Sequence, residues 1–399
     1  MYKKRNMLDG LAKGFTYLGA LTATFFLGII LYFIMANGLG RFNLALLTSD
    51  YHAQYFNGRP LRFEACETCE RPDDLSDDIL YAPQYGLGLS DTRDRGGNTV
   101  IQVTYMHPDS PLHNLVNTNN LNQPVTIAID TVITRISYTD HPTSLTRRGA
   151  ASMISDLESG ATIYEVSFST VGGGIRGSLI TTLILIGLTL AMVMPLGIAT
   201  AIYLCELAPI NRVTSTLRSL IETLTGVPSI IYGLLGISVF VPLTIRLNLT
   251  RGPSLIAGAM TLTVILLPVV IRTTEEALKT IPKDYRLASL ALGANTTQTV
   301  GKVVLPNAIP GIMTAVFLAI GRIIGESAAL IFVLGTAVKD QVRIQENSTS
   351  LAVHIWSMMT DEPANIELSS TIALLILIVV LILNIGVKLT VHQLKRKTG

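Results

Sequence analysis

Residues 282–306 read PKDYRLASLALGANTTQTVGKVVLP and lie between two long apolar runs of the chain. Pro282 at the start and Gly293 past the end are the usual punctuation of a short helix over the residues between them. A helix of two to three turns is too short to be stable alone in water, so we expect it to dock against another surface. We also expect Gly293 to end it in the left-handed conformation, which β-branched residues resist. An amphipathic connector lying on a bilayer is the alternative that the residues alone leave open.

Apolar runs on both sides of this segment, and elsewhere in the chain, are long enough to cross a membrane. A helix needs about 20 apolar residues to span roughly 30 Å of hydrocarbon. The first run follows several basic residues, as a signal peptide would, but it exceeds the usual apolar core of such peptides, so we interpret it as a retained helix. Six spans are predicted: Phe15–Met35, Leu179–Leu204, Leu220–Pro242, Leu255–Ile271, Ala308–Leu334 and Thr371–Leu389.

Charge is distributed unevenly along the 399 residues. Residues 37–175 contain 9 Arg, no Lys and 16 acidic residues, whereas the rest of the chain contains 21 basic and 12 acidic residues. Because Lys and Arg accumulate on the cytoplasmic side of membrane proteins, both termini and loop 272–307 are predicted inside, and residues 37–175 and 336–368 outside. Charged residues make up 15% of the chain, below the roughly 25% of soluble domains. A disordered chain, a collagen-like fibre and a single soluble globule are excluded.

Residues 41–175 are predicted to form a β-rich extracytoplasmic domain inserted between the first two spans. Val100–Tyr105, Val125–Asp130 and Val132–Tyr138 alternate as strands do and are separated by turn residues. Cys66 and Cys69 form one CxxC without the second pair of a four-cysteine zinc site, so we expect no metal; outside the cytoplasm the two can form a disulfide. One acidic stretch lacks the spacing of a calcium-binding loop, so we interpret it as a solvated loop rather than a cation site. Its residues are Glu64, Glu67, Glu70, Asp73, Asp74, Asp77 and Asp78.

The segment 286–306 resembles the EAA loop of ABC-importer permeases. In that family Glu-Ala-Ala, three residues, Gly, nine residues and Ile-x-Leu-Pro follow one another, and the loop is the coupling helix that binds in a groove of the ATPase subunit. Leu287 stands here at the Glu position, which removes any polar contact that a Glu would make, and Val303 stands at the Ile position. The resemblance implies that the residues that dock on the ATPase are Arg286, Leu287, Ala288, Ser289, Gly293, Leu305 and Pro306.

Further motifs are similar to phosphate-specific permeases of the PstA/PstC type, and we favour the PstA type. The similarity covers roughly residues 172–390 and the first span, but not the insertion. It implies an all-α membrane protein, namely a type I ABC importer permease with six transmembrane helices. The expected parts are the N-terminus with the first helix (1–40), the inserted domain (41–175), the five-helix permease core (176–390) and the tail (391–399). The motifs are GGGI at 172–175, GVPSIIYG at 226–233, RTTEEAL at 272–278, ALGA at 291–294 and GRIIGESA at 321–328.

The function implied by the resemblance is a permease subunit that carries inorganic phosphate across the bacterial inner membrane. Its implied partners are a second, PstC-like permease, a dimer of ABC ATPases and a soluble phosphate-binding protein, with no cofactor and no nucleic acid. The chain contains no Gly-x4-Gly-Lys-Ser/Thr loop, so we expect ATP hydrolysis in a partner and no enzyme activity in this chain.

Two charged residues stand in the fifth predicted span. Arg322 and Glu326 are four positions apart and therefore share a helix face. An arginine within a membrane helix costs about 2.5–3.5 kcal/mol on insertion scales and usually faces a protein interior or an aqueous path. Because a guanidinium binds tetrahedral oxyanions, we interpret the pair as lining the translocation path, an ion pair that only stabilises the helix being the alternative. Thr225 and Ser229, on one face of the third span with Glu222, are further path candidates; interhelical packing is their alternative.

Other functions remain as alternatives. A permease for another oxyanion, such as molybdate or sulfate, belongs to the same class. A membrane-anchored sensor would use the large insertion, but loop 272–307 is too short for a cytoplasmic output domain. An intramembrane hydrolase would need a base near Ser327, and no histidine lies in any predicted span.

Overall fold

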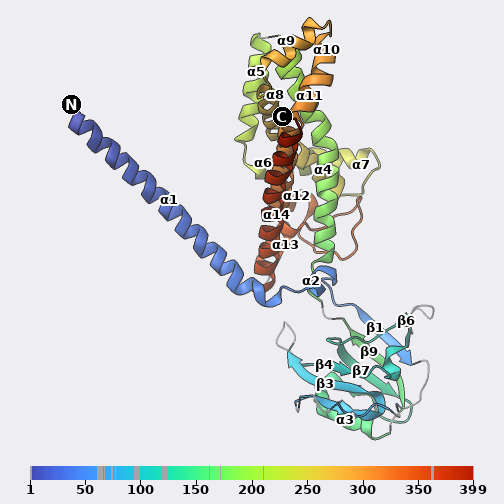
Figure 1. The fold of residues 1–399 in the computed structure, drawn as a ribbon. Coiled ribbons are helices and arrows are strands. Elements are labelled where there is room, and N and C mark those ends of the chain that lie inside the picture. The colour runs from blue at the N-terminus through green and yellow to red at the C-terminus, as the bar shows by residue number, and fades with distance from the viewer. Residues whose placement is uncertain are drawn as a thin grey trace. The chain divides into compact units, whose positions relative to one another are not determined.

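The structure of the protein is a computed structural model that describes all residues except 1, 61–65, 67, 73–74, 77, 94–98, 119–123, 161, 171, 210, 361–363 and 399; of 2–12, 41 and 390–398 it describes the backbone only. The chain forms two compact units: a helical unit of residues 1–51 and 174–399, and an inserted unit, His52–Gly173 (Figure 1). Residues outside the described ones include much of the acidic stretch: Glu64, Glu67, Asp73, Asp74 and Asp77.

Six helical segments of the described chain are long and apolar enough to cross a membrane, which confirms the predicted number of spans. They are Lys13–Gly38, Arg176–Leu207, Ser229–Arg246, Leu255–Lys279, Thr296–Gly325 and Ile366–Leu389. The α-helices of the unit are α1 (Tyr2–Gly38), α2 (Leu44–Thr48), α4 (Arg176–Ile202), α5 (Arg212–Thr225), α6 (Ser229–Leu235), α7 (Val241–Arg246), α8 (Leu255–Lys279), α9 (Lys283–Ala291), α10 (Thr296–Thr299), α11 (Leu305–Gly325), α12 (Ala328–Leu334), α13 (Leu351–Thr360) and α14 (Ile366–Thr398).

The core of the helical unit is built around α8. Leu262 and Leu266 of α8 are fully buried and pack in one cluster with Val193 of α4 and Ala319 of α11. Small residues allow the close approach of these helices: a Cβ at Gly197 of α4 would lie 2.6 Å from Cγ1 of Val270. Residues Leu255–Ile271 of α8 are without charge, as expected for a helix surrounded by others, whereas its last two turns carry charged residues.

The third predicted span, Leu220–Pro242, is not one helix. α5 ends at Thr225 and α6 begins at Ser229, because proline lacks an N–H and disfavours helical backbone in the residue before it. The hydroxyl of Tyr232 donates to the carbonyl of Leu224 across this break, at 2.8 Å. Thr225 and Ser229 therefore stand on opposite sides of a break between α5 and α6 rather than on one continuous helix face.

The fifth predicted span, Ala308–Leu334, is also divided. α11 ends at Gly325, Glu326 has extended backbone with φ −80° and ψ 118°, and α12 begins at Ala328. The Glu326 carboxylate accepts from the backbone N–H of Ala329 at 3.3 Å. The charge of Glu326 thus satisfies a backbone donor that the interruption of the helix leaves without an intrahelical partner.

The loops predicted to face opposite sides of the membrane lie at opposite ends of the helical unit (Figure 1). At the start of α4, the hydroxyl of Ser178 hydrogen-bonds Nδ1 of His354 in α13, at 2.9 Å. At its other end, a π-helical turn over Tyr203–Leu207 continues α4 and brings Glu206 to Arg286 of α9. Loops 336–368 and 272–307 are therefore separated by the length of α4.

The inserted unit is β-rich, as predicted. Its sheet has the order β2-β3-β4-β7-β9-β1-β5-β6, with β8 paired to β7, and every pairing recorded is antiparallel. A helix that the sequence did not reveal, α3 (Gly149–Glu158), contributes Met153 and Leu157 to the core. The described strands are β1 (Tyr55–Pro60), β2 (Leu80–Ala82), β3 (Leu87–Arg93), β4 (Thr99–Met106), β5 (Leu115–Asn117), β6 (Pro124–Val125), β7 (Val132–Tyr138), β8 (Ser144–Leu145) and β9 (Ile163–Ser169).

One strand prediction is wrong. Val125–Asp130 is strand only at Val125, and the residues that follow form a turn into β7. The backbone N–H of Ala128 donates to the Thr131 hydroxyl at 3.2 Å, and Asp130 has a left-handed φ of 72°. Local side-chain hydrogen bonds of this kind compete with the strand ladder, which explains why alternation of residue types misled here.

Candidate functional site

Helix α9 presents apolar side chains to its surroundings. None of its residues is buried. Leu287 is 62% exposed and Leu292, at its C-terminal end, is 90% exposed; Tyr285 and Leu290 are also exposed. Ala288 lies exposed on the same helix, and Ser289 is partly buried. Several apolar side chains exposed on one short polar helix mark a surface on which another protein can dock.

The C-terminal end of α9 has the geometry predicted for Gly293. This residue has a φ of 86°. Its N–H donates to the Leu290 carbonyl at 2.9 Å, and the N–H of Ala294 donates to the Ser289 carbonyl at 3.2 Å. These two bonds are the Schellman pattern, which satisfies the last carbonyls of a helix and requires a left-handed residue. The prediction that Gly293 ends the helix in this conformation is confirmed.

Arg286 attaches α9 to the transmembrane helices. Its guanidinium donates to both carboxylate oxygens of Glu206, at 2.6 and 3.1 Å, and to the carbonyls of Leu278 and Ile281 at 3.0 and 2.8 Å. The side chain of Glu206 is 9% exposed and that of Arg286 is 20% exposed. Hydrogen bonding to the Glu206 carboxylate raises the pKa of Arg286 above its ordinary value. A bidentate pair of this kind fixes orientation as well as distance, so α9 is held rigidly against the ends of α4 and α8.

The remainder of the predicted coupling loop folds back onto the same helix ends. The hydroxyls of Ser289 and Thr299 hydrogen-bond each other at 3.0 Å. Val304 is fully buried against Leu278 of α8, and Leu305 packs on the same cluster. Leu305 and Pro306 are the first two residues of α11. The Leu-Pro motif therefore joins loop 272–307 to the fifth membrane helix.

A cleft of about 260 Å³ lies beside this region and is lined by residues of α5 and α8, including Thr225. Its cations pair with its carboxylates. Arg218 and Lys279 contact Glu275 at 3.5 and 3.0 Å, and Arg272 contacts Glu222 at 3.4 Å. The hydroxyl of Thr225 donates to the carbonyl of Glu222 at 2.6 Å. Because the charges are matched, these ion pairs link α5 to α8 rather than present a free cation to an anion.

Arg322 and Glu326 do not share a face of one helix as predicted, because α11 ends at Gly325 and Glu326 follows it with extended backbone. The two nevertheless form an ion pair, with Nε of Arg322 at 3.6 Å from a carboxylate oxygen of Glu326. The two side chains differ in exposure: Arg322 is 54% exposed, whereas Glu326 is 6% exposed. Glu326 is thus a fixed internal anion, and Arg322 points its charge to the outside of this single chain. Ser229, at the first position of α6, is partly buried.

Two carboxylates that the sequence did not single out have central positions. Glu206 holds Arg286 across 80 positions of sequence, and Glu275 is buried between Arg218 and Lys279. A signal existed for each, since a carboxylate at the end of an apolar helix is costly without a partner. Which cation each one meets depends on the packing of distant helices and could not be read from spacing.

Part of the chain is similar in sequence to known proteins. The family model for the binding-protein-dependent transport system inner membrane component matches residues 193–398. The probable ABC transporter permease protein YqgI of Bacillus subtilis is 40% identical over 202 residues, which cover 47% of this chain and 67% of that protein. The phosphate transport system permease protein PstA 1 of Mycobacterium tuberculosis is 32% identical over 216 residues, 54% of this chain and 68% of that protein.

Two further matches cover less or are more distant. The phosphate transport system permease protein PstA homolog of Mycoplasma pneumoniae is 34% identical over 203 residues, which cover 50% of this chain and 30% of that protein. Among solved structures, a chain of the inward-facing MetNI methionine ABC transporter has a TM-score of 0.43 and 24% identity, and the match covers 55% of this chain and 95% of that chain.

Proposed function

Because the chain belongs to the family of binding-protein-dependent transport system inner membrane components, we propose that it is the permease subunit through which an ATP-driven importer moves inorganic phosphate. It is a multi-pass membrane protein and a transport subunit rather than an enzyme. Relatives named as phosphate transport system permeases support phosphate over molybdate or sulfate as the cargo. The observation that carries the proposal is helix α9, which exposes several apolar side chains and is held to α4 and α8 through Arg286.

Helix α9 is the contact through which a partner ATPase drives this chain. Its exposed Leu287 and Leu292 supply apolar area for a groove of the ATPase. Its fixed attachment through Arg286 to Glu206 means that a displacement of α9 is passed to the membrane helices rather than absorbed by a flexible joint. Apolar contact at Leu287 takes the place of a polar contact, so docking at this position relies on burial of surface.

Arg322 and Glu326 face the path of the anion. An arginine that is 54% exposed on an apolar helix is costly against lipid, so it requires an aqueous path or a second subunit beside it. A path between this chain and a second, PstC-like permease meets both requirements. Arg322 offsets the desolvation of phosphate, and Glu326 weakens the site so that the anion can leave. A protonated phosphate can donate a hydrogen bond to the Glu326 carboxylate, whereas sulfate cannot.

The orientation follows from charge and from the separation of the two ends. Loop 272–307 contains Arg272, Lys279, Lys283 and Lys302, and it lies at the end of the helical unit opposite to α13. The positive-inside rule places that end, and both termini, in the cytoplasm, where an ATPase dimer has access to ATP. The inserted unit is then extracytoplasmic, on the side from which a binding protein delivers phosphate.

Competition for uptake tests the proposal. Cells that depend on this chain and its partners for phosphate are given labelled phosphate with a hundredfold excess of unlabelled sulfate, molybdate or phosphate. We expect uptake that requires this chain and that only unlabelled phosphate suppresses. Suppression by sulfate or molybdate would reassign the cargo, and uptake unchanged by removal of the chain would reject the permease role. A membrane-anchored sensor would change gene expression without itself supporting uptake.

A further inference from the structure

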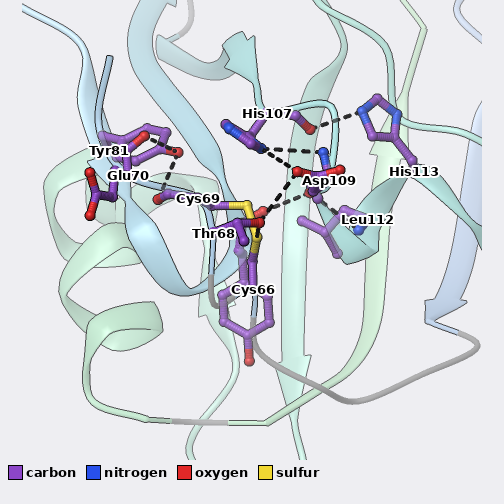
Figure 2. A network of polar contacts seen from close by, with 11 residues as sticks. Cys66, Thr68, Cys69, Glu70, Tyr81, His107, Asp109, Leu112 and His113 are labelled. Atoms are coloured by element: carbon purple, nitrogen blue, oxygen red, sulfur yellow. Dashed lines mark hydrogen bonds and ion pairs between the residues drawn. A yellow bond between two sulfur atoms is a disulfide. The ribbon is translucent and has the colours of Figure 1, made fainter. Parts of the chain in front are cut away.

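Two cysteines and a histidine come together in the inserted unit (Figure 2). Cys66 and Cys69 are joined by a disulfide, with their Cα atoms 5.6 Å apart. His107 follows the last residue of β4. One ring nitrogen of His107 and the two sulfur atoms all lie within 4.8 Å of one another. The fold therefore supplies a third potential metal ligand that the CxxC sequence lacks.

The backbone around this cluster is held by hydrogen bonds that do not involve the sulfur atoms. The N–H of Cys66 donates to the carbonyl of Gln84 at 2.7 Å, and the N–H of His107 donates to the carbonyl of Gly86 at 2.8 Å. The hydroxyl of Tyr81 donates to the carbonyl of Cys69 at 3.2 Å. These contacts do not depend on the S–S bond, so we expect them to keep the three residues close to one another when the disulfide is opened.

Gly86 makes the space in which these side chains meet. It has a left-handed φ of 60°, and a Cβ built on it would lie 2.7 Å from Sγ of Cys69 and 2.7 Å from Cβ of His107. Glycine is the residue that permits both this conformation and so close an approach. Cys69 is 3% exposed at this point. The cluster is therefore a formed and largely enclosed cradle rather than a chance encounter of surface residues.

We propose that Cys66, Cys69 and His107, after reduction of the disulfide, bind a thiophilic divalent cation such as Zn²⁺, so that metal binding by the inserted unit depends on its redox state. A dithiol donor opens the S–S bond, giving two thiols here and a disulfide on the donor. Each thiol releases a proton to solvent as its thiolate binds the ion. Two thiolates and an imidazole are a ligand set that zinc accepts, with a fourth position left for water.

Asp109 and Thr68 support His107 in this role. Nδ1 of His107 accepts from the N–H of Asp109 at 3.2 Å and lies 3.8 Å from a carboxylate oxygen of the same residue. The Thr68 hydroxyl donates to that oxygen at 3.3 Å (Figure 2). These contacts fix the orientation of the imidazole ring beside the two sulfur atoms. If Nδ1 is the nitrogen that binds the ion, it exchanges its contact with the Asp109 N–H for the metal.

Equilibrium zinc binding by the purified full-length chain tests the proposal. The chain is compared with and without prior reduction by a phosphine, under argon, and bound zinc is measured by mass spectrometry after removal of free metal. We expect about one zinc ion per chain after reduction and none before it. Cys66→Ser and Cys69→Ser abolish binding, and His107→Ala weakens it at least about tenfold. Cys205→Ser and His141→Ala, which remove a cysteine and a histidine elsewhere, serve as matched controls with unchanged binding.

Two outcomes would overturn this inference. Equal zinc content in the oxidised and reduced chain would show that the CxxC thiols do not bind the ion. Zinc binding by His107→Ala as tight as that of the unsubstituted chain would exclude the histidine. Equal resistance of the inserted unit to limited proteolysis in each variant establishes that this unit is folded, so that loss of zinc reports the ligand set.

Discussion

Arg286 is the residue on which the rigid attachment of helix α9 depends. Its guanidinium donates hydrogen bonds to two carboxylate oxygens and two backbone carbonyls instead of to water. Its partner Glu206 is almost fully buried. Removing one member of a buried pair leaves the other charge uncompensated, which typically costs about 3–5 kcal/mol. The loss falls on the docking of α9 against α4 and α8, because these are the elements that the pair joins.

We therefore expect Arg286→Gln to insert into the membrane but to lose most ATP-driven uptake. Lys283→Gln, which removes a cation from the exposed first position of the same helix, is the matched control and should transport normally. The double variant Arg286→Gln with Glu206→Gln removes the stranded carboxylate, and it should recover membrane stability without recovering the full rate. Uptake at matched membrane levels measures each. Normal transport by Arg286→Gln would show that the Arg286–Glu206 pair is not needed for transport.

Arg322 and Glu326 act unequally if they line the path. Arg322→Gln leaves the buried Glu326 carboxylate as an uncompensated negative charge beside the route of an anion, so phosphate uptake should nearly disappear. Glu326→Gln leaves an unopposed arginine, which should retain the anion and slow its release. The amide oxygen of Gln can still accept from the Ala329 N–H, but without the charge of the carboxylate, so the membrane level of this variant must be measured alongside uptake.

The doubly neutral variant Arg322→Gln/Glu326→Gln distinguishes a path from an ion pair that only stabilises the fold. If the pair only stabilises the fold, deleting both charges restores stability and uptake together, because no unpaired charge remains. If the pair lines the path, deleting both charges restores stability but not uptake. Labelled phosphate uptake by all three variants at equal membrane levels decides, and near-normal transport by the double variant would contradict a path role.

At the scale of single elements, the end of α9 offers the cleanest substitution. A Cβ at Gly293 would meet no atom within 4 Å, so its substitution strains only the backbone. The left-handed conformation costs about 1–2 kcal/mol for a residue with a Cβ, which corresponds to a roughly 5- to 30-fold loss of the native helix end.

Gly293→Val should therefore reduce co-purification of the chain with its ATPase by about that factor, together with uptake. Gly301→Val is the matched control, since a Cβ there also meets open space but no left-handed φ is involved. Equal association of the two variants with the ATPase would show that the conformation of Gly293 does not matter for docking.

Elements were predicted best where the environment leaves the backbone no choice. Helices that cross a bilayer must satisfy their own hydrogen bonds, so long apolar runs identified six spans. The interruptions at Pro228 and Glu326 were placed inside spans, because hydropathy averages over a window and does not detect two or three extended residues. The turn after Val125 escaped notice because Thr131 and Asp130 act through local hydrogen bonding and a left-handed φ.

At the scale of the whole molecule, the inserted unit should be separable from transport. Its connections to the helical unit begin at Tyr51 and Gly174, and the N–H of Gly174 donates to the carbonyl of Asp50 at 2.9 Å. Since these ends are already adjacent, a short Gly/Ser linker can replace His52–Gly173 without stretching the helical unit.

We expect the linker variant to retain uptake of labelled phosphate and stimulation of ATP hydrolysis by the partner ATPases. The location of the unit is tested separately by Asp140→Cys, at an exposed turn, and Lys283→Cys on α9, both in a Cys205→Ser chain. An impermeant maleimide should label Asp140→Cys in intact cells and Lys283→Cys only after lysis. The reverse pattern would invert the proposed topology, and abolished coupling in the linker variant would make the insertion part of the transport machinery.

The contacts that sequence could not supply are those that join distant segments. Residue types at positions 286, 293, 322 and 326 pointed to a candidate coupling loop, through its resemblance to a known family, and to a charged pair, because each signal lies within a few residues. Glu206 meets Arg286, and His107 meets Cys66 and Cys69, only after folding brings together segments tens of residues apart. Long-range pairing depends on packing, and local spacing carries no information about it.

If this chain passes phosphate with energy delivered through α9, ATP hydrolysis by the assembled transporter depends both on phosphate and on the attachment of α9. The most direct measurement is ATP hydrolysis by the transporter reconstituted in liposomes from this chain, its partner permease, the ATPases and the binding protein. We predict that phosphate-loaded binding protein stimulates hydrolysis and that the Arg286→Gln variant loses this stimulation while the Lys283→Gln variant keeps it. Hydrolysis that ignores phosphate, or stimulation that survives in Arg286→Gln, would contradict the account.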